Sequence, residues 1–133
     1  MKKKKISKNK IIDMEIKKTG KLFSFCCMAP AIIKNKNKSE IKFFENIGSK
    51  IGLLFQIADD LIDYKSTSKT AGKKTGKDKK KGKATLISLL GYENAIKYSN
   101  KIKSKITSDL NRYGQKAKNI NETLKYILVR NKW

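Results

Sequence analysis

The stretch FQIADDLID, residues 55–63, decides the fold and the chemistry that the sequence predicts. It places Asp59, Asp60 and Asp63 within an otherwise apolar helical pattern over residues 51–62. At about 3.6 residues per turn, Asp59 and Asp63 lie one above the other on a single helix face. A helix that is apolar on most sides is typical of a protein interior, where an uncompensated carboxylate is costly. The pattern therefore predicts a buried helix whose acidic face requires a cation.

Two or three acids on a helix more often form a solvent-exposed face, and this alternative has to be weighed here. The surrounding run of isoleucine, leucine and phenylalanine argues against it, because a solvated helix would not be apolar on its other sides. Carboxylate oxygens suit Mg²⁺, which prefers one or two protein carboxylates and takes its other ligands from water and substrate phosphates. The acidic run therefore predicts a site for Mg²⁺ and a diphosphate.

A lysine- and glycine-rich segment follows the acidic helix. It reads TAGKKTGKD over residues 70–78 and KKKGKATL over residues 79–86. Glycines give the backbone freedom and lysines provide ammonium groups, so the sequence predicts a mobile loop over about residues 65–82 that closes on phosphate oxygens. Such segments are more often plain flexible linkers, and the position directly after the acidic helix favours the functional interpretation.

These motifs, taken together, resemble a known family. FQIADDLIDY, GKKTGKD and KGKATL resemble the second aspartate-rich region of the trans-prenyl diphosphate synthases. Upstream, residues 18–20 resemble the family's KTG element, and residues 126–132 look like the terminus of a bacterial farnesyl diphosphate synthase. The resemblance covers about residues 11–132. It implies an all-α fold, namely a partial isoprenoid synthase helical bundle that corresponds to the C-terminal half of such an enzyme.

The resemblance also implies a role for individual residues. Asp59 corresponds to the principal Mg²⁺ ligand, which Asp60 and Asp63 support directly or through water. Phe55 corresponds to an aromatic residue that borders the homoallylic substrate. The groups that contact or shape the site of the allylic diphosphate are Lys18, Thr19, Gln56, Lys73 and Lys83. Of all these residues, the resemblance implies a catalytic role for Lys18, Thr19, Gln56, Asp59 and Lys73.

The implied reaction condenses an allylic diphosphate, dimethylallyl or geranyl, with isopentenyl diphosphate to give a farnesyl-type product. Its difficult step is the departure of the anionic diphosphate, which metal ions and lysines assist by stabilising the developing charge. Before Asp59 the only acids are Asp13, Glu15, Glu40 and Glu45, so the first aspartate-rich motif of the family is missing. We therefore expect negligible turnover by this chain alone, and a need for an N-terminal half or for a homo-oligomer. A noncatalytic subunit of such a synthase remains an alternative.

The net charge of +22 supports a rival hypothesis, a basic helical protein that binds nucleic acid. Of the 33 basic residues only Arg112 and Arg130 are arginine, and lysines lie in nearly every segment instead of forming one stripe. The sequence also contains no helix-turn-helix, zinc or aromatic RNA-binding motif. We therefore expect nonspecific binding to nucleic acid at low salt and no specific partner of that class.

The hydrophobic spacing predicts helices and no strands. Residues 1–10 form a lysine-rich lead-in, and the resemblance implies that residues 11–133 are part of one polyprenyl synthetase domain. Gly48 and Gly52 fall inside a helical pattern, where glycine is unfavourable, so they predict close approach by a neighbouring helix. Pro30 is expected to lie just beyond the end of the first helix. Helices are expected over residues 11–28, 39–64, 84–90, 93–113 and about 121–131, with a polar connection over residues 31–38.

The start of the chain mimics a signal peptide, because a lysine-rich lead precedes an apolar run over residues 22–33. The lead contains Asp13 and Glu15, and the run is too short to span a bilayer, so a core helix is the better interpretation. Cys26 and Cys27 are adjacent and lack CxxC spacing. They are expected to be reduced core cysteines, which favours a cytoplasmic protein without a membrane span.

Overall fold

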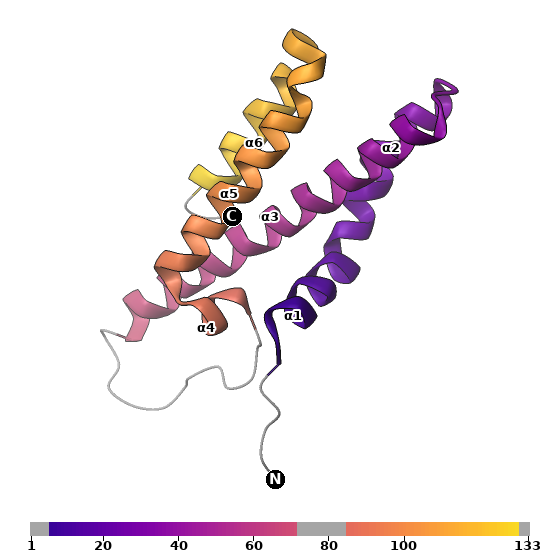
Figure 1. Cartoon of the computed structure of the whole chain (residues 1–133). Coiled ribbons are helices and arrows are strands. Elements are labelled where there is room, and N and C mark those ends of the chain that lie inside the picture. Colours follow the sequence, from indigo (N-terminus) through magenta and orange to yellow (C-terminus); the bar gives the residue numbers. More distant parts are fainter. Residues whose placement is uncertain (1–5, 72–84, 131–133) are drawn as a thin grey trace.

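The computed structural model describes residues 6–71 and 85–130, and all its regular elements are helices (Figure 1). The all-α prediction is therefore confirmed for this part of the chain. In order, the elements are α1 (Lys8–Glu15), the π-helical turn η1 (Ile16–Gly20), α2 (Lys21–Ile33), α3 (Lys38–Ala71), α4 (Leu86–Leu90), α5 (Tyr92–Leu110), the 3₁₀ segment η2 (Asn111–Ala117) and α6 (Lys118–Val129).

Helix α3 is the centre of the structure, and the other elements pack along it (Figure 1). The larger core cluster joins α3 to α5, η2 and α6 through buried side chains that include Leu54, Ile106 and Leu124. A second cluster joins α3 to α1 and α4 through Ile11, Ile57 and Leu86. Helix α3 thus carries two apolar faces, which is why its sequence is hydrophobic on most sides. No helix within the described ranges is long and apolar enough to cross a membrane.

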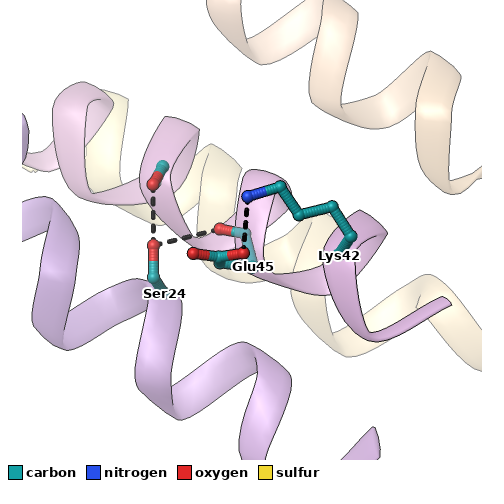
Figure 2. Close-up of polar contacts among 4 residues, drawn as sticks. Ser24, Lys42 and Glu45 are labelled. Atoms are coloured by element: carbon teal, nitrogen blue, oxygen red, sulfur yellow. Dashed lines mark hydrogen bonds and ion pairs between the residues drawn. The ribbon is translucent and has the colours of Figure 1, made fainter. Parts of the chain in front are cut away.

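Helices α2 and α3 approach each other unusually closely, as the glycines predicted. A Cβ atom added at Gly48 would lie 2.4 Å from the Phe23 carbonyl oxygen, and one added at Gly52 would lie 2.6 Å from the Cα atom of Gly20. Polar contacts reinforce this crossing (Figure 2): the Ser24 hydroxyl donates to the Glu45 carbonyl at 3.0 Å. The Glu45 carboxylate itself pairs with Lys42 of the same helix, α3, at 2.8 Å. The prediction of close helix packing at these glycines is confirmed.

Two predicted boundaries are wrong. Helix α2 continues through Pro30 to Ile33, because Pro30 lies only three residues before the helix end and costs a single hydrogen bond to Cys26. The helix stops instead where Asn35 takes the left-handed conformation, with φ of 50°. Helix α3 continues to Ala71, so residues 65–71, predicted as part of the loop, are helical. The remainder of the predicted loop, residues 72–82, lies outside the described residues.

The remaining boundaries differ less. The first helix begins at Lys8, inside the predicted lead-in, where the Ser7 hydroxyl caps it. The short helix after the loop ends before Gly91 as predicted, and Gly91 has φ of 82°. Both cysteines are free thiols, but Cys26 is exposed and only Cys27 is half-buried, so the prediction that both lie in the core is wrong for Cys26. Successive helix positions are about 100° apart, and therefore only one of two adjacent cysteines faces α3.

Asp109 on α5 joins two helices through its carboxylate. It pairs with Lys105 on its own helix at 2.9 Å and with Lys50 on α3 at 3.0 Å. Hydrogen bonding to Lys105 outweighs the effect of burial and, together with the contact to Lys50, lowers the pKa of the carboxyl below its ordinary value. A lowered pKa stabilises the fold above the unfolded pKa of about 3.9, and this contribution is lost as the pH falls through the folded value.

We expect Asp109→Asn to reduce the free energy of unfolding by up to about 1 kcal/mol at neutral pH, because both lysines are partly exposed. Urea unfolding followed by circular dichroism measures this change. The difference from wild type should shrink on acidification below the unfolded pKa. Asp13→Asn is the control, because the Asp13–Lys17 pair lies within one exposed helical segment and joins no two helices. A pH-independent loss in the Asp109 variant would contradict the electrostatic explanation.

Candidate functional site

Three separate parts of the chain meet at one end of the acidic run of α3. They are the π-helical turn η1, the segment around Gln56 and Asp59 on α3, and Arg130, which directly follows α6. Thr19 of η1 donates from its hydroxyl to the Gln56 side-chain oxygen at 3.0 Å. Single π turns within α-helices are rare, and those that occur are often found at functional sites. The KTG element and the acidic run, both identified in the sequence, are therefore joined by a direct hydrogen bond.

Gln56 passes this contact on to Asp59. Because its oxygen accepts from Thr19, its amide nitrogen is turned towards Asp59 and donates to Oδ2 at 3.3 Å. The other carboxylate oxygen of Asp59, Oδ1, is paired with the guanidinium of Arg130. Gln56 is buried and the Arg130 side chain is only 6% exposed, so this set of contacts is largely shielded from water. Both oxygens of the Asp59 carboxylate are thus held in a fixed orientation.

The aromatic ring of Phe55 stacks against the guanidinium of Arg130. The centre of its ring lies 4.2 Å from the guanidinium carbon of Arg130 and 5.4 Å from the ring centre of Phe23 on α2. A guanidinium over an aromatic face gains a cation–π attraction that strengthens as water is excluded. The predicted substrate-bordering aromatic is therefore, in this structure, the stacking partner of Arg130.

The surroundings of the Asp59 carboxyl change its pKa. Burial raises its pKa above the ordinary value, and the nearby Asp63 adds to the rise. Arg130 and Gln56 act in the opposite direction without cancelling the increase. A carboxylate whose charge is disfavoured by its surroundings gains more than an exposed one from an approaching cation. Perturbed acids of this kind are concentrated at functional sites.

The other predicted residues are placed less tightly. Asp63 is exposed and lies one turn beyond Asp59, whereas Asp60 is partly buried and points about 100° away around the helix. Lys18 is exposed beside Thr19. Lys73 and Lys83 lie outside the described residues.

The donor set can be compared with the needs of Mg²⁺. Within residues 6–71 and 85–130, no three His, Cys, Asp or Glu side chains gather closely enough to hold a metal ion. Asp59 and Asp63 nevertheless supply hard oxygen donors on one helix face, which fits the preference of Mg²⁺ for one or two protein carboxylates completed by water and phosphate. A two-carboxylate site of this kind fits the ion.

Arg130 is the member of the site that the sequence interpretation missed. It lies in the terminal segment that resembles the family, but the resemblance implied no role for this residue. The feature of the sequence that could have pointed to it is the rarity of arginine, which accounts for only two of the 33 basic residues. Arginine is favoured over lysine in buried ion pairs because its planar, weakly hydrated group can bind a carboxylate and stack on an aromatic ring at the same time.

Comparisons with known proteins identify the family of the chain. A sequence profile of the polyprenyl synthetase family matches residues 1–127. The farnesyl diphosphate synthase of Micrococcus luteus is 32% identical over 129 residues, which are 97% of this chain and 44% of that enzyme. The farnesyl diphosphate synthase of Bacillus subtilis is 38% identical over 79 residues, 59% of this chain and 27% of that enzyme.

Solved structures give the same result. The crystal structure of an FPP/GFPP synthase from Zymomonas mobilis matches with a TM-score of 0.75 and 34% identity, and the match covers 92% of this chain and 39% of that one. The chain therefore spans less than half the length of these relatives.

Proposed function

The chain belongs to the polyprenyl synthetase family, and on that premise we propose that it forms part of the catalytic cavity of a trans-prenyl diphosphate synthase. The reaction is the Mg²⁺-dependent condensation of an allylic diphosphate, dimethylallyl or geranyl, with isopentenyl diphosphate to a farnesyl-type product. The observation that carries this proposal is the chain of contacts from Thr19 through Gln56 to Asp59. It brings the KTG element and the aspartate-rich motif together at one site, where a diphosphate and its metal ion would have to meet.

Each residue has a defined task in this proposal. Asp59 and Asp63 present carboxylate oxygens to Mg²⁺, and Gln56 fixes the orientation of Asp59. When bound, Mg²⁺ offsets the negative charge that develops on the departing diphosphate. Lys18 adds an ammonium group beside Thr19, and Lys73 and Lys83 are proposed to contact the same diphosphate. Asp60 is proposed to support the metal site through water. Phe55, backed by Phe23, stacks on Arg130 and so helps to shield the ion pair of Arg130 with Asp59 from water.

We further propose that this chain is not sufficient for catalysis and acts with the remaining part of a synthase. Helix α2 supports this view, because one of its faces is apolar and exposed. Leu22 is 65% exposed, Phe25 59% and Ile33 76%, and with Cys26 and Ala29 they recur at the three- and four-residue spacing of a single stripe. Monomeric proteins rarely leave such a stripe open to water. Because both cysteines are free thiols, which persist in a reducing compartment, we take the site of action to be the cytoplasm.

Ligand binding tests the proposed site. We expect the chain to bind geranyl diphosphate in calorimetry when Mg²⁺ is present and to lose that binding when the ion is chelated. In Asp59→Ala the affinity should fall by about 100-fold or more, since even the outer partners of metal ligands are worth 10–100-fold. Asp13→Ala is the matched control, because it removes an exposed helical carboxylate of equal charge.

Metal dependence also separates this function from general anion binding. A chain with a net charge of +22 attracts any polyanion at low salt, but such attraction does not require Mg²⁺ or Asp59. Equal binding by the wild-type and Asp59→Ala chains, with or without Mg²⁺, would contradict the proposed function.

A further inference from the structure

Arg130 places a cation of the chain's own on the carboxylate that is proposed to hold the metal. Helix α6 ends at Val129, and the backbone of Arg130 turns to an extended conformation with φ of −61° and ψ of 138°. The side chain then lies between the Asp59 carboxylate and the Phe55 ring, where it is 6% exposed. The chain thus fills this position with a buried, permanently charged group.

We propose that Arg130 competes with divalent cations for Asp59, so that a cation has to displace Arg130 before it can bind to this carboxylate. This inference rests on the proposed function only in taking Asp59 as a metal ligand. Both oxygens of Asp59 already accept hydrogen bonds, Oδ1 from Arg130 and Oδ2 from Gln56. A divalent ion that approached Oδ1 would meet the positive charge of the guanidinium at short range, in a setting where charge repulsion is only weakly screened. Arg130 and the ion therefore exclude each other at this oxygen.

The competition sets the affinity of the site for metal. While Arg130 holds Asp59, the charge of the carboxylate is partly compensated and its orientation is fixed without any ion. Metal binding then requires loss of the ion pair and of the stacking on Phe55, so the free ion binds weakly. Removal of the guanidinium should consequently strengthen metal binding, whereas removal of a supporting residue would normally weaken it.

The chain contains a matched control for this prediction. Arg112 is its only other arginine, and its guanidinium carbon lies 4.1 Å from the centre of the Phe43 ring, nearly the same stacking as Arg130 on Phe55. Arg112 belongs to η2, and its partner Phe43 lies near the start of α3, away from Asp59. Arg112→Gln therefore removes the same charge and the same kind of stack without changing the contacts of Asp59.

The experiment is a titration of the whole chain with Mn²⁺, an oxygen-preferring stand-in for Mg²⁺, with the free ion measured by electron paramagnetic resonance. We expect Arg130→Gln to bind Mn²⁺ about tenfold more tightly than wild type, and Arg112→Gln to match wild type. The double variant Arg130→Gln/Asp59→Asn should lose the gain. Arg130→Lys, which keeps the charge without the planar fork, should fall between wild type and Arg130→Gln and serves as the test if the glutamine variant does not fold.

Equal or weaker Mn²⁺ binding by Arg130→Gln, or a gain that persists without Asp59, would overturn the inference. The outcome is separable from that of the proposed function. If Mg²⁺-dependent binding of geranyl diphosphate is found but Arg130→Gln shows no gain, only the competition fails. If the gain is found and depends on Asp59 while no allylic diphosphate binds, the competition stands and the prenyl synthase function fails.

Discussion

Gly48→Ala is expected to lower the free energy of unfolding by about 2 kcal/mol, a large loss for a chain of this size. The added methyl group would lie 2.4 Å from the Phe23 carbonyl oxygen and 2.6 Å from the Cα atom of Ser24. Both obstacles are backbone atoms of α2, so α2 as a whole has to move away. Alanine favours a helix over glycine by about 1 kcal/mol, and the clash has to exceed this gain.

Thermal unfolding followed by circular dichroism at 222 nm, the α-helix band, measures the effect of Gly48→Ala. The matched control is Ser68→Ala, a small change at an exposed position of the same helix. It should leave the transition almost unchanged. A Gly48→Ala chain as stable as the control would show that α2 and α3 do not approach as closely as described.

Prenyl transfer is expected to be near background for this chain alone and to rise by about a thousandfold when the remaining part of a synthase is supplied. The reason is positional, because catalysis requires both substrates and all counter-charges to be held within a few ångströms. The part of the Micrococcus luteus farnesyl diphosphate synthase that has no counterpart in this chain, more than half of that enzyme, is a suitable complement. Incorporation of labelled isopentenyl diphosphate into acid-labile product measures the rate.

The exposed stripe of α2 makes this prediction specific. We expect Leu22→Asp/Phe25→Asp to block reconstitution, because the two side chains are 65% and 59% exposed and would be covered by the added helices. Tyr126→Asp on α6, where the side chain is 66% exposed, is the control and should reconstitute normally. Activity of the double variant equal to wild type, or loss in the control alone, would place the covered surface on another face of the chain.

The sequence predicted the parts of the fold that depend on repeating or local patterns. The apolar spacing around Leu54 identified α3, and Gly48 and Gly52 identified its close contact with the neighbouring η1–α2 segment. The Asp59–Asp63 face followed from helix geometry alone. These features are predictable because one helix sets the spacing of all of them.

Other features depend on contacts between distant residues, and the sequence could not supply them. Nothing near Arg130 indicates that its partner is Asp59, 71 positions earlier. Pro30 does not end its helix, because a proline near a helix end removes only one hydrogen bond. The helical conformation of residues 65–71 was missed because serine and threonine resemble loop residues, whereas here Ser66 and Thr67 donate back to carbonyls four residues earlier.

The π-helical turn η1 changes how the α1–η1–α2 segment can tolerate insertions and deletions. The buried positions of this segment are Ile11, Glu15, Gly20, Ser24 and Ala31, with separations of four, five, four and seven residues. The five-residue step is one longer than an α-helical turn allows, and η1 absorbs the additional residue. A chain lacking one residue within η1 would form an uninterrupted α-helix whose two ends still face α3. The hydroxyl of Thr19, however, would move away from Gln56. A one-residue change in length at η1 would thus alter the contacts of the site but leave the packing of α1 and α2 on α3 in place.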